Sequence, residues 1–374
     1  MSPDLFYVLQ REEPSETFIR REIEALRVIG IPVHVYSLAI PQVEHDVTPL
    51  LRRAFRRRLV ERLFKPPFSP VYAARLLRNA PHALRLAATA ARLPHPRFHA
   101  HFAWSAADAA SLAAETLGIP WTCSVHAWDV FTRPSRETGA RLASAAGVTA
   151  CTERAADALR AAGIPEARIR VIRHGLDPAA FPFTVDRTDG TLPGRIAAVG
   201  RLVPKKGFDS LVDACVHLRK QGIPFTCTLV GDGPERRPLE RQAAAGGILD
   251  LVTFTGWIDP NAAQRAIADA TVLVHPSRRL DNNDSDGFAN VLSEALFLGT
   301  PIITTPAGAA TELLCECARI VPSDDPESLA AAITHLFRNP EACRSLAAAA
   351  RHTAEIHLDQ NRLIRELADF LNRE

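Results

Sequence analysis

The hydrophobic residues of this chain occur in two alternating patterns, which predict strands and helices in turn. Residues 4–10 (DLFYVLQ) and 32–38 (PVHVYSL) are short apolar runs of the kind that form buried strands. Between them, apolar side chains recur at helical spacing, at Phe18, Ile23, Leu26 and Ile29. Strand, helix and strand in this order predict a parallel sheet with helices on both faces.

The alternation continues along most of the chain. Further strands are predicted at 97–103, 121–127, 147–152 and 169–174, and then at 195–202, 225–232, 251–257, 271–275 and 301–305. The polar segment 184–194 (TVDRTDGTLPG) predicts a linker between the two groups. We therefore expect an α/β chain of two Rossmann-like doubly wound domains, 1–184 and 185–355, facing across a cleft that binds a ligand. Residues 356–374 are expected to form a helix that packs back on the first domain.

Residues 50–64 combine an apolar face with an arginine-rich one. The apolar positions recur every four residues, and six arginines lie opposite or flank them: Leu51, Phe55, Leu59 and Leu63 against Arg52, Arg53, Arg56, Arg57, Arg58 and Arg62. This pattern predicts a basic amphipathic helix. Two interpretations stay open, a solvated face of an ordinary domain helix or a surface that binds an anionic acceptor or an anionic membrane.

The composition excludes some classes of protein. With 374 residues, 47% of them hydrophobic, the chain is long enough for two domains. Its net charge of +2 gives no basic excess for phosphates, so no nucleic-acid partner is expected. The seven cysteines show no CxxC pair and no zinc-type Cys/His spacing. Because the sequence shows no signal peptide and no long apolar run, we expect a cytoplasmic location, with or without peripheral attachment to the inner face of the membrane.

The segment 286–294 (DGFANVLSE) is a candidate for binding chemistry. Asp286 precedes a predicted helix, and Glu294, eight residues later, falls on roughly the same side. The backbone N–H groups between them start that helix, where an anion is favoured. Two carboxylates and a helix start can hold separate parts of one polar ligand. The alternative is an ordinary acidic N-cap followed by a helical glutamate.

A second candidate lies at the start of the second domain. The sequence 200–207 (GRLVPKKG) ends a strand and opens a helix, which allows Arg201 and Lys206 to reach a diphosphate together. Lysine is rare in this chain, since the 44 basic residues include only Lys65, Lys205, Lys206 and Lys220. The alternative is a basic loop at the domain surface.

Histidines gather in the first domain. His99 and His101 share one face of a predicted strand, but no third metal ligand is evident, so no metal site is predicted there. His126 falls at the carboxyl end of the next predicted strand, the edge at which open parallel sheets bind ligands. Taken alone, that position of His126 favours a structural role.

The order of the motifs is more specific than any one of them. The first half contains PSETFIRREIEAL, HAHFAWSAADAA, GIPWTCSVHAWDVF and VIRHGLD, and the second half contains GRLVPKKGFD, LVGDGPE, FTGW and DGFANVLSEA. Together they resemble the retaining glycosyltransferases of family 4 (glycosyltransferase group 1), which have the GT-B fold. The first-half motifs are similar to the colanic-acid and exopolysaccharide branch. The resemblance covers nearly the whole chain except 50–93 and the last helices.

The resemblance implies roles for individual residues. Arg201 and Lys206 would hold the diphosphate of a nucleotide sugar, and Glu294 the ribose. Asp286, where the family usually has Glu, would contact the sugar hydroxyls, and His126 would lie beside the reacting sugar. The implied catalytic set is thus His126, Arg201, Lys206 and Asp286. The implied nucleotide-sugar site further includes Gly231, Gly233, Trp257, Gly287, Phe288, Ala289 and Asn290, and the acceptor side His101, Trp128 and Asp129.

The resemblance implies an enzyme that moves a sugar, with retention of configuration, from a UDP- or GDP-linked donor to a glycan or lipid-linked acceptor in polysaccharide or glycoconjugate biosynthesis. No metal or other cofactor is expected, because arginine and lysine would replace magnesium at the diphosphate. Two alternatives remain. One is another GT-B nucleotide-sugar enzyme, such as an epimerase or a phosphorylase. The other is a non-catalytic nucleotide-sugar binder, to which only the unusual Asp286 points.

Overall fold

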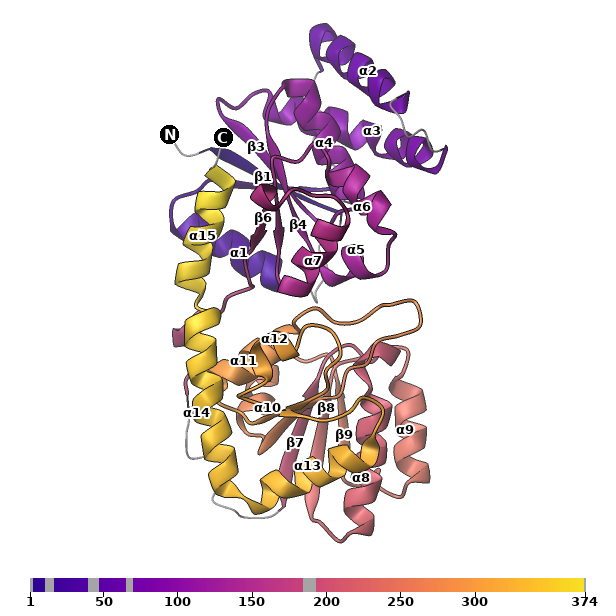
Figure 1. Cartoon of the computed structure of the whole chain (residues 1–374), viewed down its shortest axis with the longest axis vertical. Coiled ribbons are helices and arrows are strands. Elements are labelled where there is room, and N and C mark those ends of the chain that lie inside the picture. The colour runs from indigo at the N-terminus through magenta and orange to yellow at the C-terminus, as the bar shows by residue number, and fades with distance from the viewer. Residues whose placement is uncertain (1–2, 11–16, 40–46, 65–69, 184–192, 373–374) are drawn as a thin grey trace. The chain divides into compact units, whose positions relative to one another are not determined.

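The chain forms two compact units, shown in a computed structural model that describes residues 3–10, 17–39, 47–64, 70–183 and 193–372 (Figure 1). The N-terminal unit comprises Met1–His174 and Asn361–Glu374, and the C-terminal unit comprises Gly175–Gln360. The division therefore falls before the predicted linker, of which residues 184–192 lie outside the described part of the chain.

The N-terminal unit is built on six parallel strands in the order β2-β1-β3-β4-β5-β6. The strands are β1 Asp4–Leu9, β2 Val33–Ser37, β3 Pro96–His101, β4 Trp121–Val125, β5 Gly147–Ala150 and β6 Ile169–Val171. The helices are α1 Thr17–Val28, α2 Pro49–Leu63, α3 Pro70–Ala90, α4 Ser105–Leu117, α5 Ala127–Phe131, α6 Ser135–Leu142, α7 Glu153–Ala161 and α15 Gln360–Asn372. Strand order reverses between β1 and β3, and such switch points are where open sheets bind ligands.

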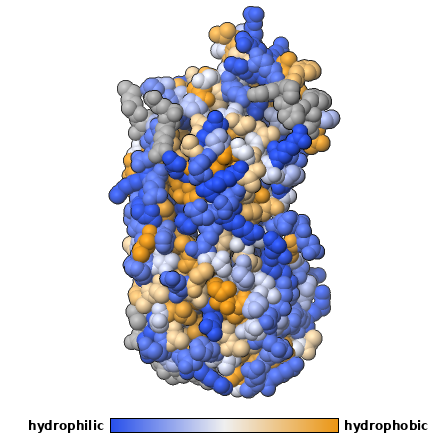
Figure 2. All heavy atoms as spheres, viewed as in Figure 1, coloured by the Kyte–Doolittle hydropathy of each residue, from blue (hydrophilic) through white to orange (hydrophobic). Residues whose placement is uncertain are grey.

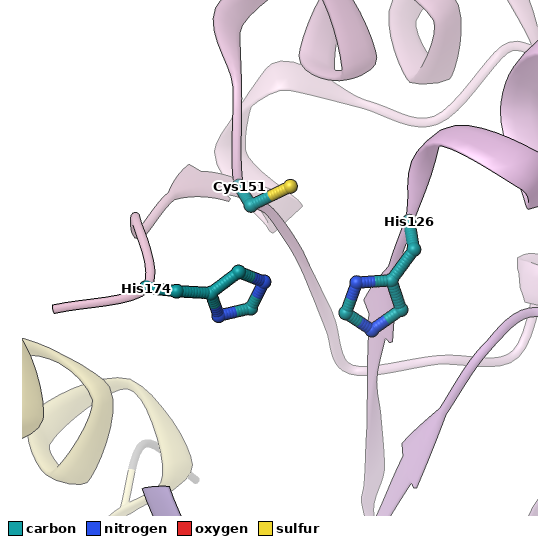
Figure 3. Close-up of side chains that lie close together, drawn as sticks. All are labelled: His126, Cys151 and His174. Carbon is teal, nitrogen blue, oxygen red and sulfur yellow. The ribbon is translucent and has the colours of Figure 1, made fainter. Parts of the chain in front are cut away.

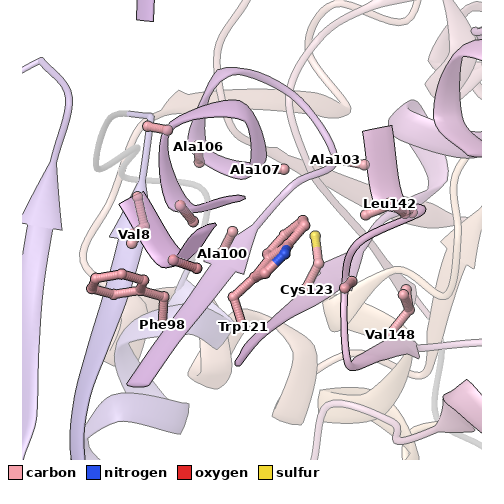
Figure 4. Packing of buried hydrophobic residues seen from close by; sticks show 14 of the residues in the cluster. Val8, Phe98, Ala100, Ala103, Ala106, Ala107, Trp121, Cys123, Leu142 and Val148 are labelled. Atoms are coloured by element: carbon pink, nitrogen blue, oxygen red, sulfur yellow. The ribbon is translucent and has the colours of Figure 1, made fainter. Parts of the chain in front are cut away.

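Apolar layers cover both faces of this sheet. On one face, the small side chains of Ala106 and Ala107 in α4 let the helix approach Phe98 and Trp121 closely (Figure 4). On the other face, α1 and α15 pack against Tyr7 and its neighbours in β1. Full burial of a side chain such as Phe98 stabilises the fold by about 1.5–3 kcal/mol.

The last helix packs on the first strand and helix of the chain. Leu367 and Phe370 of α15 belong to the same buried cluster as Leu5 of β1, and Arg97 donates a hydrogen bond to the carbonyl of Leu371 at 3.1 Å. Gly147 permits the close contact, because a Cβ there would lie 2.6 Å from the Phe370 ring. Helix α15 is therefore an integral part of the N-terminal unit.

Helix α2 places its apolar face on the core of the unit, with Phe55 buried. Arg62 differs from the predicted pattern, because its guanidinium donates to Ser111 at 2.8 Å and lies 3.7 Å from Glu115. Its charge is therefore held within the unit rather than presented on the arginine-rich face. Arg52, Arg53 and Arg56 are exposed.

The C-terminal unit has six parallel strands in the order β12-β11-β10-β7-β8-β9. The strands are β7 Gly194–Val199, β8 Phe225–Val230, β9 Val252–Gly256, β10 Val272–His275, β11 Ile302–Thr304 and β12 Arg319–Ile320. The helices are α8 Phe208–Lys220, α9 Arg236–Ala245, α10 Pro260–Ala268, α11 Asn290–Leu298, α12 Thr311–Leu314, α13 Pro326–Arg338 and α14 Pro340–His357. Its switch point lies between β7 and β10.

Helices also cover both faces of the second sheet. The cluster on one face includes Leu211 of α8 and Ile333 of α13, and the cluster on the other includes Leu296 of α11 and Ala350 of α14. The predicted α/β fold of two doubly wound halves is confirmed by these two sheets. All seven cysteines are thiols, and Cys315 is exposed. Within the described residues, no helix has both the length and the apolar content needed to span a membrane.

Candidate functional site

The switch point of the C-terminal unit brings charged side chains from three segments together. Strand β7 ends at Val199 and leads through a short 3-10 helix, Pro204–Lys206, into α8. Strand β10 ends at His275, and the loop that follows carries Asp286 toward the start of α11. Lys206, His275 and Asp286 therefore meet at the edge of the sheet where ligands bind in this architecture.

The contacts around Asp286 are short and largely shielded from water. Lys206 Nζ donates to Asp286 Oδ2 at 2.6 Å, and His275 Nε2 lies 3.2 Å from the same oxygen. Lys205 Nζ lies 2.9 Å from Asp284 Oδ1 and 3.7 Å from Asp286 Oδ1. The side chains of Lys206 and Asp286 are 12% and 11% exposed, so their attraction is only weakly screened. We call Lys205, Lys206, His275, Asp284 and Asp286 the lysine–aspartate cluster.

The protonation states of this cluster follow from burial and charge. Burial alone would raise the pKa of Asp286, but Lys206, His275 and Lys205 outweigh it and hold that pKa well below its usual value. Burial lowers the pKa of His275 despite the neighbouring carboxylate. An ionised carboxylate only accepts hydrogen bonds, so the neutral His275 ring donates to Asp286 through Nε2. Asp286 is thus fixed as an anion beside two lysines.

The start of α11 tests the N-cap interpretation of Asp286. The N-cap of this helix is Ala289, which makes no side-chain cap hydrogen bond. Asp286 lies three residues earlier and faces Lys206 instead. The ordinary N-cap alternative is therefore wrong for Asp286. Phe288, Ala289 and Asn290 are half-buried around the helix start.

Two glycines allow the loops after β7 and β8 to lie against each other. The Gly231 backbone has a φ of +130°, and a Cβ there would lie 2.0 Å from the Gly200 carbonyl oxygen. A Cβ on Gly233 would lie 2.4 Å from the carbonyl oxygen of Leu202. Leu202 N–H donates to the Asp232 carbonyl at 2.9 Å. The glycines of the GDGPE motif therefore shape the wall next to Gly200.

Other predicted donor-site residues lie in the same unit but outside the lysine–aspartate cluster. Arg201 is exposed in the turn after β7, and Glu294 is half-buried in the second turn of α11. Trp257 follows β9 and is 61% exposed. Gly287 is half-buried directly after Asp286. Lys206 and Asp286, predicted from two separate motifs, are joined directly in the structure.

The N-terminal unit gathers histidines at the carboxyl ends of neighbouring strands. His101 ends β3, His126 follows β4, and His174 lies just after β6. The His126 ring stacks on those of His101 and His174, with centroids 5.6 Å away in each case and planes 16° and 19° apart. His101 Nδ1 and His126 Nε2 are 3.4 Å apart. His126 is 8% exposed and His101 is fully buried.

The carboxylate of Glu22 in α1 anchors this histidine stack. Its Oε1 lies 3.2 Å from His101 Nε2 and accepts the Tyr7 hydroxyl at 2.5 Å. Burial opposes the charge of Glu22, but His101 and its neighbours lower the pKa to about 2. Burial lowers the pKa of His99 to about 3 and of His174 to about 4, and places that of His126 well below its ordinary value.

Asp129 and Trp128, predicted on the acceptor side, have different environments. Asp129 is 2% exposed, accepts the backbone N–H of His126 at 2.9 Å, and has its pKa raised by burial to about 7. It therefore holds the turn that carries His126. Trp128 is 42% exposed and packs edge-on against Trp104, with the Arg133 guanidinium 4.6 Å from its ring centroid.

Several site residues were missed from the sequence. His275 ends a strand that was predicted, so its position at a carboxyl end was the available signal. Cys151 and His174 share this signal, because they follow the carboxyl ends of β5 and β6. No sequence signal marked Glu22, because it lies on α1, and the position of this helix beside β1 and β3 depends on the fold. Glu22 supplies the third potential ligand that the sequence did not show for His99 and His101.

Comparison with known proteins agrees with this geometry. Residues 192–353 match the family model "Glycosyl transferases group 1", and residues 15–180 match the model "Glycosyltransferase Family 4". The first match spans the lysine–aspartate cluster and the second spans the histidine stack. The chain belongs to the family 4 (group 1) glycosyltransferases. Each half of the molecule is thus matched by one of the two models.

Curated relatives of this chain are glycosyltransferases by name. The amylovoran biosynthesis glycosyltransferase AmsK of Erwinia amylovora is 30% identical over 217 residues, which cover 58% of this chain and 53% of AmsK. A GDP-mannose-dependent α-(1-6)-phosphatidylinositol monomannoside mannosyltransferase of Mycolicibacterium smegmatis is 31% identical over 233 residues, covering 60% of this chain and 57% of that protein. The chain therefore spans about half the length of the curated relatives it matches.

Solved structures show the same fold along the whole chain. Anabaena Alr3699/HepE in complex with UDP has a TM-score of 0.75 and 19% identity, covering 99% of both chains. The sucrose-phosphate synthase of Thermosynechococcus elongatus has a TM-score of 0.74 and 20% identity, covering 99% of this chain and 98% of the other. The predicted GT-B fold is thereby confirmed.

Proposed function

We propose that this glycosyltransferase family member moves a sugar, with retention of configuration, from a UDP- or GDP-linked donor to a glycan or lipid-linked acceptor in polysaccharide or glycoconjugate biosynthesis. The C-terminal unit binds the donor and the N-terminal unit binds the acceptor. The exopolysaccharide-related names of the relatives and the UDP bound by a structural neighbour support this choice of substrates.

The observation that carries the proposal is the lysine–aspartate cluster at the switch point between β7 and β10. Lys206 has three N–H donors, of which Asp286 takes one at 2.6 Å, so the ammonium can also hold a diphosphate oxygen. Lys205 adds a second positive charge, balanced by Asp284 at 2.9 Å. A largely water-shielded edge with fixed cations is suited to stabilising the charge that develops on a departing diphosphate.

The chemistry needs placement and charge stabilisation rather than a protein nucleophile. The bond between the anomeric carbon and the diphosphate oxygen breaks, and the acceptor oxygen bonds to that carbon from the same face. The acceptor proton passes to the departing phosphate oxygen. Arg201 and Lys206 hold the diphosphate, Asp286 holds the sugar hydroxyls, and His126 lies beside the reacting sugar. No metal is needed in this scheme, because the cations neutralise the leaving group.

A transfer assay with product analysis tests the activity. The wild-type chain should convert a UDP- or GDP-sugar and an acceptor to a glycoside with the donor's anomeric configuration. Lys206→Ala should lower turnover by at least about 100-fold, because a fixed transition-state contact is worth about 10²–10³ in rate. Lys220→Ala, which removes an exposed lysine at the end of α8, is the matched control.

The products also separate the rival activities. An epimerase changes the nucleotide sugar without an acceptor, and a phosphorylase requires inorganic phosphate. Epimerisation of the nucleotide sugar without an acceptor, or turnover that requires inorganic phosphate, would contradict the proposal. A glycoside of inverted configuration would also contradict it. A folded chain that binds the nucleotide sugar and turns over none of it would be a binding protein instead.

A second part of the proposal concerns an anionic membrane surface. Helices α2 and α3, with the C-cap of α2, carry both exposed arginines and exposed apolar side chains: Arg52, Arg53 and Arg56, and Leu50, Val60, Phe64, Val71 and Leu77. Figure 2 shows apolar side chains in orange beside strongly hydrophilic ones in blue over these two helices. Arginine next to exposed apolar groups favours the interface of an anionic bilayer, where a lipid-linked acceptor resides.

Vesicle co-sedimentation tests this membrane surface. The chain should bind vesicles with anionic lipid at low salt, and an Arg52→Gln/Arg53→Gln/Arg56→Gln variant should bind them roughly 100-fold more weakly, since each of the three arginines near the surface contributes about 1 kcal/mol. Arg57→Gln/Arg58→Gln is the control, because these two arginines already pair with Glu61 at 2.8 and 2.9 Å. Equal sedimentation with neutral and anionic vesicles would rule the surface out.

A further inference from the structure

Three neighbouring strands of the N-terminal unit end in side chains that ligate metals. His126 follows β4 directly, Cys151 follows β5 directly, and His174 lies three residues beyond β6. One ligand atom from each residue lies within 4.8 Å of the other two. Figure 3 shows ring nitrogens of His126 and His174 pointing toward each other, with the Cys151 sulfur beside them. The parallel order of the sheet brings them together from separate parts of the sequence.

We propose that His126, Cys151 and His174 form a binding site for a zinc ion. Two imidazole nitrogens and one thiolate are donors that zinc prefers. Bonds of about 2.0–2.1 Å to nitrogen and about 2.3 Å to sulfur place tetrahedral donors roughly 3.3–3.6 Å apart. Starting within 4.8 Å, the three donor atoms need to close by about 1 Å, which small side-chain rotations supply.

The cavity between these residues supplies the fourth position. His126, Cys151 and His174 line it together with polar side chains that include Glu22 and Thr149. Its volume of about 10 Å³ is close to the room that one water molecule needs. Three protein ligands and one water make an open zinc site, in contrast to the four protein ligands of a structural site.

A hydrogen-bond chain orients His126 for this role. Glu22 accepts from His101 Nε2 at 3.2 Å, which leaves His101 Nδ1 as the acceptor for His126 Nε2 at 3.4 Å. His126 Nδ1 then carries the lone pair that a metal requires. Metal-binding histidines usually donate their second nitrogen to such a partner, and a carboxylate at the end of the chain strengthens the arrangement.

A neighbouring group, Glu22, His99 and His101, has similar donor atoms but is less suited to a metal. His99 uses both ring nitrogens, with Thr122 Oγ1 at 2.8 Å and Ser124 Oγ at 2.9 Å. A metal would have to break these buried hydrogen bonds. The strand-end site of His126, Cys151 and His174 is therefore the one we assign.

Zinc at this site would withhold His126 from the donor sugar and slow transfer. This consequence rests on the proposed function, whereas metal binding itself does not. Zinc that occupies the site without slowing transfer would count against the role of His126 in the reaction and would leave the site standing.

Metal binding is tested on the full-length, metal-depleted chain by competition with a chromophoric chelator. The wild type should take up one zinc ion per chain. Cys151→Ser and His174→Ala should each bind it at least about 100-fold more weakly, because the loss of an outer partner alone costs 10–100-fold. Cobalt as a spectroscopic probe should show thiolate-to-metal charge transfer in the wild type and lose it in Cys151→Ser.

Cys315→Ser is the matched control, since it removes the exposed thiol in the C-terminal unit. It should bind zinc as tightly as the wild type and keep the cobalt absorption. Circular dichroism establishes that each variant is folded. If one of the two ligand variants, Cys151→Ser or His174→Ala, fails to fold, the other still tests the site. The proposal is overturned by a wild type that takes up no zinc at micromolar concentrations, by ligand variants that bind as the wild type does, or by loss of binding in Cys315→Ser.

Discussion

Asp286, where the resemblance implies a longer acid in most of the family, is surrounded by two lysines. Lys206 Nζ lies 2.6 Å from one of its carboxylate oxygens and Lys205 Nζ lies 3.7 Å from the other. The carboxylate stays ionised because these cations outweigh the cost of burial. In the proposed donor site, the two lysines therefore fix the charge and the position of this carboxylate.

Individual residues were predictable where their chemistry was unusual for the chain. Lys206 stood out because lysine is rare here, and Asp286 because it precedes a helix beside glycine. His275 did not stand out, since a histidine at the end of an apolar strand looks structural until its neighbours are known. The motifs predicted Arg201 and Glu294 as site residues in the same way as Lys206. The direct contact between Lys206 and Asp286 became known only from the structure.

Gly231 should be intolerant of any side chain. Its φ of +130° and a Cβ position 2.0 Å from the Gly200 carbonyl oxygen mean that Gly231→Ala forces the loops after β7 and β8 apart. We expect Gly231→Ala to destabilise the C-terminal unit by more than about 4 kcal/mol, which lowers its Tm by roughly 10 °C or more. Differential scanning calorimetry measures the shift.

Gly222→Ala is the control for the Gly231 prediction. Gly222 also has a positive φ, +69°, but nothing lies within 4 Å of its Cβ position. Only backbone strain of about 1–2 kcal/mol is then expected. Equal Tm shifts for the two variants would show that the close approach of the loops contributes nothing to stability.

At the scale of elements, the strand ends carry the chemistry of the N-terminal unit. The sequence placed His126 at the end of a strand and His101 inside the strand predicted at 97–103, whereas in the structure β3 ends at His101. The sequence did not show that β3, β4, β5 and β6 are adjacent, since strand order depends on how the helices cross the sheet. For the same reason the meeting of Cys151 and His174 with His126 could not be predicted.

The buried histidines make the N-terminal unit sensitive to acid. Burial lowers the pKa of His99 to about 3 and of His174 to about 4, whereas an unfolded histidine has a pKa of about 6.5. Between these values the unfolded chain binds more protons, so the free energy of unfolding falls as pH falls from about 6.5 toward 4. His99, His174 and His126 each add up to about 1.4 kcal/mol per pH unit, and Asp129, whose pKa burial raises to about 7, subtracts about as much, which leaves a slope of up to about 3 kcal/mol per pH unit.

Urea unfolding at pH 7.5, 6 and 5 checks this dependence by tryptophan fluorescence. Three of the four tryptophans, Trp104, Trp121 and Trp128, lie in the N-terminal unit and report on it. His99→Gln should reduce the slope, and His352→Gln, at an exposed position in the C-terminal unit, should not. A slope that is the same for wild type and His99→Gln would disprove the assignment.

At the scale of the whole molecule, one architectural plan is used twice with different strand orders. The C-terminal sheet has the strand order of dinucleotide-binding domains. In the N-terminal sheet, the strand order reverses direction between β1 and β3. Periodicity predicted both sheets, because buried parallel strands are continuously apolar and helices are amphipathic. The motif order then indicated the family, which the two family models confirm.

Isothermal titration of UDP and GDP tests the central claim, that the lysine–aspartate cluster holds the donor diphosphate. One of the two nucleotides should bind wild type and Lys220→Ala with the same Kd, and Lys206→Ala at least about tenfold more weakly, because a hydrogen bond to a charged group contributes about 1.5–3 kcal/mol. The corresponding nucleoside should bind all three equally. Undiminished diphosphate binding by folded Lys206→Ala, or no nucleotide binding by the wild type, would contradict the account.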